Sequence, residues 1–194
     1  MLEHFDAISP AFNGTPFRNA AEMMLEKGYA WDYISDLQLK NSEASEGLIM
    51  TQGNVYKTLI LPGSEYIPLE TFAQILKMAN DGATILVYGD FPENVAGLNN
   101  LEIKKDAFKR FKNGVSFSQT NNPEVLKASY GKGMILSGSN LDAMLSYAGI
   151  KREPMADNNI KFVRRNKGSD FNYFILNQGE KPFDGWIQLQ VNHS

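Results

Sequence analysis

The fold is decided by two apolar runs, VYKTLIL at residues 55–61 and ATILVY at residues 83–88. Both are rich in β-branched and aliphatic residues, which predicts two strands buried within a sheet. Pro68 is well placed to begin a helix between them. Apolar residues then recur at intervals of three and four, as in an amphipathic helix, at Leu69, Phe72, Ala73, Leu76 and Ala79. Strand, helix and strand at this spacing predict a βαβ unit with a parallel sheet.

The pattern extends in both directions along the chain. Downstream, residues 134–137 predict a third strand, and Ser139 can cap a helix that ends at Gly149. The intervening segment is less regular, with helices expected at 102–112 and 123–130. Upstream, a helix over 17–27 stops at Gly28, and a strand-like piece over 29–34 precedes a short helix that Ser35 can cap.

Beyond Gly149 the hydrophobic period changes. The segments 160–165, 171–177 and 185–191 alternate or run as strands with turns between them. We therefore expect an α/β domain over residues 1–150, with a mainly parallel sheet covered on both faces. Residues 151–194 are expected to form an antiparallel β extension, which either lengthens the sheet or begins a second, all-β domain.

Composition excludes several classes of protein. The 194 residues are 43% hydrophobic and 21% charged, which is typical of a globular domain. A net charge of −3 gives no electrostatic reason to expect nucleic acid or an anionic membrane as partner. No apolar run approaches the roughly 20 residues of a membrane helix, and the first residues do not resemble a signal peptide.

The chemistry available to the chain is also restricted. It has no cysteine, and its two histidines, His4 and His193, lie near the ends of the sequence. A cysteine nucleophile, a histidine-dependent triad and a multi-histidine metal site are therefore not expected. The serine turn at 137–139 lacks a well-placed histidine, and the glycine pair at 131–133 precedes a strand, so we interpret the latter as a turn.

Three carboxylates stand at or just after the ends of predicted strands, where open α/β sheets bind ligands. Asp32 and Asp36 flank a strand-to-helix turn, and Glu65 follows the strand over 55–61. A pair of such groups can serve acid–base chemistry or hold a divalent ion. Each also has a simpler interpretation as a solvated or helix-capping group, which four-residue spacing favours for Asp32 and Asp36.

Aromatic residues accompany the first of these carboxylates. Trp31 and Tyr33, with Tyr29, alternate along the strand-like piece and would lie on one side of it. Such a row can stack on a sugar face, and it can equally belong to the core. We retain Trp31, Asp32, Tyr33, Asp36 and Glu65 as candidate ligand-binding residues.

Several segments, taken together and in order, resemble one family of enzymes. GYAWDYISD at 28–36 is similar to a stretch of the α-L-rhamnosidase-like enzymes of glycoside hydrolase family 106. The likeness covers most of residues 28–190, while residues 1–27 match poorly. It continues through YKTLILP at 56–62, IPLET at 67–71, GATI at 82–85, GKG at 131–133, SG at 137–138, RR at 164–165, YFILN at 173–177 and GW at 185–186.

The resemblance implies the α/β domain that follows the catalytic barrel in that family. Its fold would be flavodoxin-like or glutamine amidotransferase-like, a three-layer sandwich, with the last strands leading into a β-sandwich. The family's catalytic carboxylates and calcium site belong to the barrel, so the resemblance implies no catalytic residue, metal ligand or cofactor in this chain. The implied partners are neighbouring domains of a larger glycosidase, in the periplasm or outside the cell if that enzyme is exported.

Two other hypotheses stay open from the sequence. One is a stand-alone module that binds carbohydrate or another protein chain. The other is a small hydrolase on a flavodoxin-like scaffold that uses Asp32, Asp36 or Glu65.

Overall fold

The computed structural model describes residues 12–167 and 170–190. Its contacts divide the chain into two compact units. Among the described residues, the larger unit takes 12–20 and 33–150, and the smaller takes 21–32, 151–167 and 170–190. The first helix, α1 (Pro16–Lys27), contributes residues to both units and ends at Gly28, whose φ of 81° is left-handed. The sequence placed the boundary between domains at residue 150.

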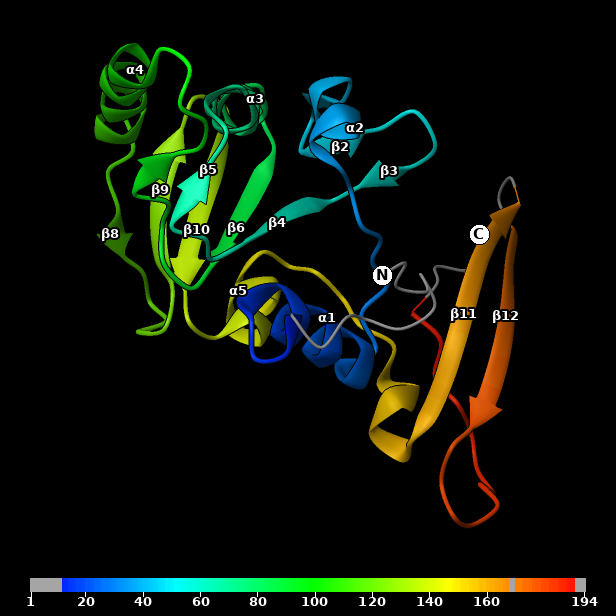
Figure 1. Cartoon of the computed structure of the whole chain (residues 1–194). Coiled ribbons are helices and arrows are strands. Elements are labelled where there is room, and N and C mark those ends of the chain that lie inside the picture. The colour runs from blue at the N-terminus through cyan, green and yellow to red at the C-terminus, as the bar shows by residue number, and fades with distance from the viewer. Residues whose placement is uncertain (1–11, 168–169, 191–194) are drawn as a thin grey trace, which may run out of the picture. The chain divides into compact units, whose positions relative to one another are not determined.

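The larger unit contains a mixed five-stranded sheet, coloured from cyan through green to yellow-green in Figure 1. Strand β6 pairs in parallel with β4 on one side and with β10 on the other. Strand β9 pairs antiparallel with β10, and β8 pairs antiparallel with β9. In spatial order the strands are β4 (Thr58–Pro62), β6 (Thr84–Tyr88), β10 (Gly133–Gly138), β9 (Leu126–Tyr130) and β8 (Ser118–Gln119).

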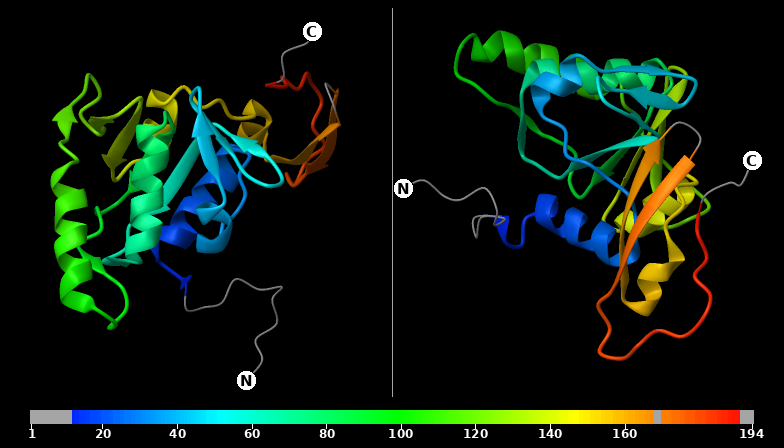
Figure 2. Two further views of the ribbon diagram at one scale, coloured as in Figure 1. Left: turned by 90° about the horizontal axis from the view of Figure 1, so that it is seen from above. Right: turned by 90° about the vertical axis from the view of Figure 1, so that its right-hand side faces the viewer.

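Helices cover both faces of this sheet, with α3 (Leu69–Asn80) and α5 (Leu141–Tyr147) on opposite sides (Figure 2). Because side chains alternate along a strand, Ile85 and Val87 of β6 join the core beneath α3. The intervening Leu86 is also fully buried. Helix α4 (Leu101–Asn113) packs against α3 and sends Phe108 into the α3 side of the core.

Smaller elements complete the larger unit. A short helix, α2 (Asp36–Lys40), begins with a capping box in which Ser35 and Gln38 exchange hydrogen bonds. An antiparallel sheet contains β1 (Glu43–Ser45), β2 (Leu48–Met50) and β3 (Val55–Tyr56). A separate parallel pair joins β5 (Tyr66–Ile67) to β7 (Asn94–Val95).

The turn between β9 and β10 requires its glycines. A Cβ atom on Gly133 would stand 2.2 Å from the Ala83 carbonyl oxygen, and one on Gly131 would stand 2.5 Å from the Asn80 carbonyl oxygen. Gly131 also has a left-handed φ of 57°. The glycine pair therefore lets the β9–β10 hairpin approach the end of α3, and its interpretation as a turn is confirmed.

The smaller unit is built on a long hairpin. Strand β11 (Ile160–Lys167) pairs antiparallel with β12 (Asp170–Asn177), and a 3₁₀ helix, η2 (Pro154–Asn158), precedes them. Gly28 lies against this helix, and its carbonyl oxygen accepts a hydrogen bond from the Glu153 backbone nitrogen at 2.8 Å. Residues 21–32 thus pack in the same unit as a segment more than a hundred residues later in the chain. Hydrophobic periodicity does not predict such a long-range contact.

Most of the expected elements are confirmed, and three are wrong. The segment 29–34 is irregular, the expected helix over 123–130 is largely the strand β9, and residues 185–190 form no strand. The run over 55–61 is interrupted at Lys57 and divides into β3 and β4. Asn140 caps α5 where Ser139 was expected. The comparison of this mixed sheet with flavodoxin-like or glutamine amidotransferase-like sandwiches stays a prediction.

No helix within residues 12–167 and 170–190 is both long and apolar enough to cross a membrane.

Candidate functional site

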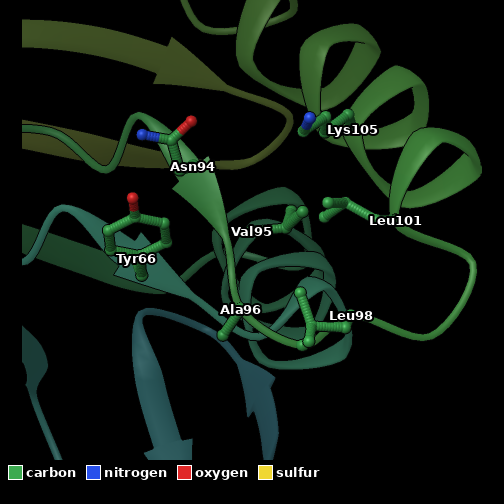
Figure 3. A pocket seen from close by; sticks show the side chains of 8 residues that line it. Tyr66, Asn94, Val95, Ala96, Leu98, Leu101 and Lys105 are labelled. Carbon is green, nitrogen blue, oxygen red and sulfur yellow. The ribbon is translucent and has the colours of Figure 1, made fainter.

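A hollow lies at one corner of the larger unit, between the β5–β7 pair and α4 (Figure 3). Its volume is about 380 Å³. Residues 67 and 95 pair across β5 and β7, and their buried side chains join the core. Their neighbours Tyr66 and Asn94 also pair, and alternation turns these two side chains the other way, into the hollow.

The opposite wall of the hollow is apolar apart from one cation. Leu101 and Lys105 come from α4, and Leu98 comes from the loop before that helix (Figure 3). The Lys105 ammonium forms an ion pair with Glu102, one turn earlier on α4, at 3.0 Å. The site therefore combines a phenol, an amide and an ammonium group with an apolar floor.

Glu65 accepts several hydrogen bonds at the rim of this hollow. Its carbonyl oxygen accepts hydrogen bonds from the backbone nitrogens of Glu93 and Asn94, at 3.2 and 2.9 Å. Its carboxylate accepts a longer bond from the Asn94 amide at 3.4 Å. A hydrogen bond with this carboxylate, together with its negative charge, raises the pKa of Tyr66. The Glu65 carboxylate thus interacts with both side chains that the β5–β7 pair turns into the hollow.

A second, smaller hollow of about 260 Å³ adjoins the first. The two share Asn94, Val95 and Lys105 as lining residues, and the second adds Glu93 and Lys109. An aromatic ring, an amide and charged groups at a shallow apolar depression are the groups that orient a polyhydroxylated or anionic small molecule. The arrangement can bind and orient such a molecule.

The structure brings one of the candidate residues into this site. Glu65 lies at its rim, in the turn between β4 and β5. Asp36 is the first residue of α2, exposed beside the Ser35 cap, and a carboxylate there is stabilised by the helix dipole. The two carboxylates therefore stand on different elements, and neither hollow described above is lined by Asp36.

The remaining candidates lie in the irregular segment over 31–35. Trp31 is half-buried, while Asp32 and Tyr33 are exposed. The Tyr33 ring stacks on Phe17 of α1, with 5.0 Å between ring centroids. Tyr29 is buried. Because the segment is not a strand and its aromatic residues differ in burial, the expected row on one side of a strand is wrong.

Sequence reasoning missed most of the hollow. Tyr66, Asn94 and Lys105 come from three elements, and no local motif links them. The only signal was Glu65, in the turn after β4. Within the described ranges, no cluster of three or more acidic or histidine side chains is arranged to hold a metal ion. Both histidines of the chain fall outside those ranges.

Comparison with known proteins identifies the family. A family model for α-L-rhamnosidase matches residues 9–193, almost the whole chain. The chain belongs to the α-L-rhamnosidase family. The family supports the coarse description of the chain as glycoside hydrolase-like, which the sequence resemblance had indicated.

Two relatives show how much of such a protein this chain represents. A protein named putative beta-glucuronidase from Formosa agariphila is 25% identical over 94% of this chain, which corresponds to 15% of that protein. A solved rhamnosidase from Novosphingobium sp. PP1Y matches 78% of this chain, with a TM-score of 0.59 and 20% identity. The match covers 14% of that enzyme. This member of the α-L-rhamnosidase family thus spans a small part of the length of each relative. At 20% identity, its likeness to the solved rhamnosidase shows a shared fold.

Proposed function

We propose that this chain is a non-catalytic α/β segment of a longer glycoside hydrolase of the α-L-rhamnosidase family. Its role would be structural: it packs against neighbouring domains or lines one side of the cleft they form. The observation that carries the proposal is the extent of the match, which fills residues 9–193 of this chain and only 15% of a curated relative.

The placement of the acidic residues supports a role without catalysis. Glycoside hydrolysis ordinarily needs two carboxyl groups that face each other across a glycosidic bond, roughly 5–10 Å apart. Asp36 starts α2, whereas Glu65 follows β4 and is engaged with Asn94. Asp32 lies in an irregular segment and belongs to the smaller unit.

Turnover by the isolated chain tests the proposal directly. Purified chain is incubated with an aryl α-L-rhamnoside and an aryl β-D-glucuronide, beside an intact glycosidase known to cleave each substrate. We expect release of the aryl group at the rate of the protein-free blank. If the chain releases it above the blank, and Glu65→Gln or Asp36→Asn abolishes that release, the chain is a hydrolase and the proposal fails.

A second candidate function rests on the corner hollow. Tyr66, Asn94 and Lys105 present the aromatic, amide and cationic groups that recognise a sugar or a sugar acid. A carbohydrate-binding role predicts amide shifts at β5 and β7 when L-rhamnose or D-glucuronate is titrated into ¹⁵N-labelled chain. These shifts should vanish in Tyr66→Ala and persist in Leu37→Ala, a matched exposed position on α2. Absence of shifts with both sugars would remove this candidate.

A further inference from the structure

The β11–β12 hairpin has two faces of very different character. Cross-strand partners share a face, so the register places Ile160, Phe162, Arg164 and Tyr173 on one side. This side is partly covered within the smaller unit, although Ile175 and Phe171, which share it, are 41% and 39% exposed. Ile160 is buried, and Arg164 and Tyr173 both donate hydrogen bonds to one carboxylate oxygen of Glu153, at 2.9 and 2.7 Å.

The other face of the hairpin carries exposed apolar side chains among charged and polar ones. Val163 pairs directly with Phe174, and Leu176 follows two residues later on the same side. These three side chains are 56%, 71% and 49% exposed. Large apolar groups that adjoin on a sheet face, and are not scattered singly, mark a surface that another polypeptide covers.

The backbone pairing of the hairpin also indicates that another polypeptide segment binds there. Within the described residues, β12 pairs with β11 alone, although it runs for eight residues and contains the strongly strand-forming sequence YFIL. A lone two-stranded hairpin is marginal in water, and a long apolar edge is a template for a further strand. Among residues 12–167 and 170–190, the outer edge of β12 therefore has no neighbouring strand, and the Val163–Phe174 pair remains largely exposed.

The charged residues at the margin of the face indicate which side chains a segment bound there would carry. Lys161 lies beside Leu176, and Arg165 lies two residues beyond Val163, both on the exposed side. Lys161 also donates to the Leu25 carbonyl oxygen at 3.4 Å, so the covered end of this face is the end near residue 161. Asp170 shares this face near the turn of the hairpin, so the basic character is confined to the flanks of the Val163–Phe174 pair. An apolar pair with basic flanks fits a strand whose side chains alternate apolar with outward-facing groups and include carboxylates.

We propose that the Val163–Phe174–Leu176 face binds an extended, acidic-flanked β-segment from the rest of a longer glycoside hydrolase polypeptide. That segment adds a strand at the outer edge of β12, so that its apolar side chains lie beside Phe174 and Leu176 and extend the apolar part of the face. The inference rests on the proposed function, because relatives contain about 85% of their length outside the matched region. A tethered segment has an effective concentration in the millimolar range, so it outcompetes a second copy of the chain.

Hydroxyl-radical footprinting with mass spectrometry tests the proposal at Phe174. The native polypeptide is isolated from its source cells with an antibody against this chain, and it is compared with the purified 194-residue chain. We expect a longer polypeptide in which Phe174 is oxidised about tenfold more slowly than in the isolated chain, because a packed interface excludes water. Met155, buried within the smaller unit, should be equally slow in both samples and reports that the unit is folded.

Each other outcome overturns the inference. A longer polypeptide in which Phe174 reacts as fast as in the isolated chain leaves the proposed function standing and removes the docking face. A native polypeptide of 194 residues removes both. In that case, protection of Phe174 in a dimer would assign the face to a second copy.

Substitutions supply an independent readout. The double variant Val163→Ser and Phe174→Ser should lower the thermal midpoint of the longer native-length polypeptide and leave that of the isolated chain unchanged. Asn172→Ser, on the same face but polar, is the matched control and should alter neither. Equal effects of the double variant on both polypeptides would show that the two side chains act only within the chain.

Discussion

The larger and smaller units are held together by different physical means. The larger unit buries a continuous apolar core in which Phe72 contacts the rings of Phe91 and Phe108, at centroid distances of 5.7 and 4.8 Å. The smaller unit is centred on Glu153, a carboxylate that is only 2% exposed. The larger unit therefore depends on apolar burial, whereas the smaller unit combines fewer buried apolar side chains, among them Met155 and Ile160, with a buried and hydrogen-bonded carboxylate.

Glu153 uses both of its carboxylate oxygens. One accepts from Arg164 and Tyr173, and the other accepts from the backbone nitrogen of Gln190 at 2.9 Å. The last bond fastens the irregular segment after β12 to the residue that precedes η2. A buried ion pair adds little net stability, but its directional bonds allow few alternative arrangements. We infer that Glu153 fixes how the hairpin and its following segment are arranged in the smaller unit.

The largest effect on stability is expected from truncating a side chain in the apolar core of the larger unit. Phe72→Ala should lower the free energy of unfolding of the larger unit by about 4 kcal/mol, because it leaves a cavity between two aromatic rings. Hydrogen exchange of the β6 amides in denaturant measures this free energy. A loss below about 1 kcal/mol would mean that the core closes over the cavity.

The next effect is expected at the buried carboxylate. Glu153→Ala should lower the free energy of opening of the smaller unit by about 3 kcal/mol, because Arg164, Tyr173 and Gln190 lose their common acceptor. Exchange of the β11 amides reports this opening. Asp157→Ala breaks an exposed ion pair with Arg152 in the same unit and should lower the free energy of opening far less, because water screens the pair. Equal losses of free energy of opening in the two variants would show that Glu153 stabilises the smaller unit no more than an exposed ion pair does.

A smaller effect on stability is expected at Gly133, where the β9–β10 turn closely approaches backbone carbonyl groups. Gly133→Ala should destabilise the larger unit by about 2 kcal/mol, because its Cβ would collide with the carbonyl oxygens of Ala83 and Ala79. Gly53→Ala is the matched control, since a Cβ atom there meets nothing within 4 Å. Thermal unfolding of both variants measures the difference. Equal midpoints would show that the β9–β10 turn moves away from α3 without cost.

The smallest effect is expected at alkaline pH. Burial, and next the hydrogen bond to Glu153, raise the pKa of Tyr173 above its ordinary value of 10.0. Between that value and the raised one, the unfolded chain loses this proton and the folded chain keeps it. Stability contributed by the group is therefore present below pH 10 and falls as the pH rises further.

The phenylalanine variant supplies the comparison for this pH dependence. Opening of the smaller unit is followed by β11 amide exchange over the alkaline range, in wild type and in Tyr173→Phe. The variant should lack the part of the pH dependence due to Tyr173. Parallel curves for the two proteins would contradict the assignment.

Local sequence determined the regular elements of the larger unit. Periodicity over 69–79 gave α3, the apolar runs gave β4 and β6, and Ser35 and Gly28 marked the ends of helices as capping chemistry requires. The glycines at 131 and 133 marked a turn. These predictions succeed because each depends on residues within one or two turns of each other.

Only the tertiary structure decided the features that join distant residues. Residues 126–130 become a strand because β10 supplies their partners, although a helix was expected there. The corner hollow exists because β5 pairs with β7 and α4 passes beside them. Glu153 is buried because Arg164 and Tyr173 oppose each other across a hairpin. Burial and pairing are properties of neighbours in space, and the chain order of a single sequence does not specify those neighbours.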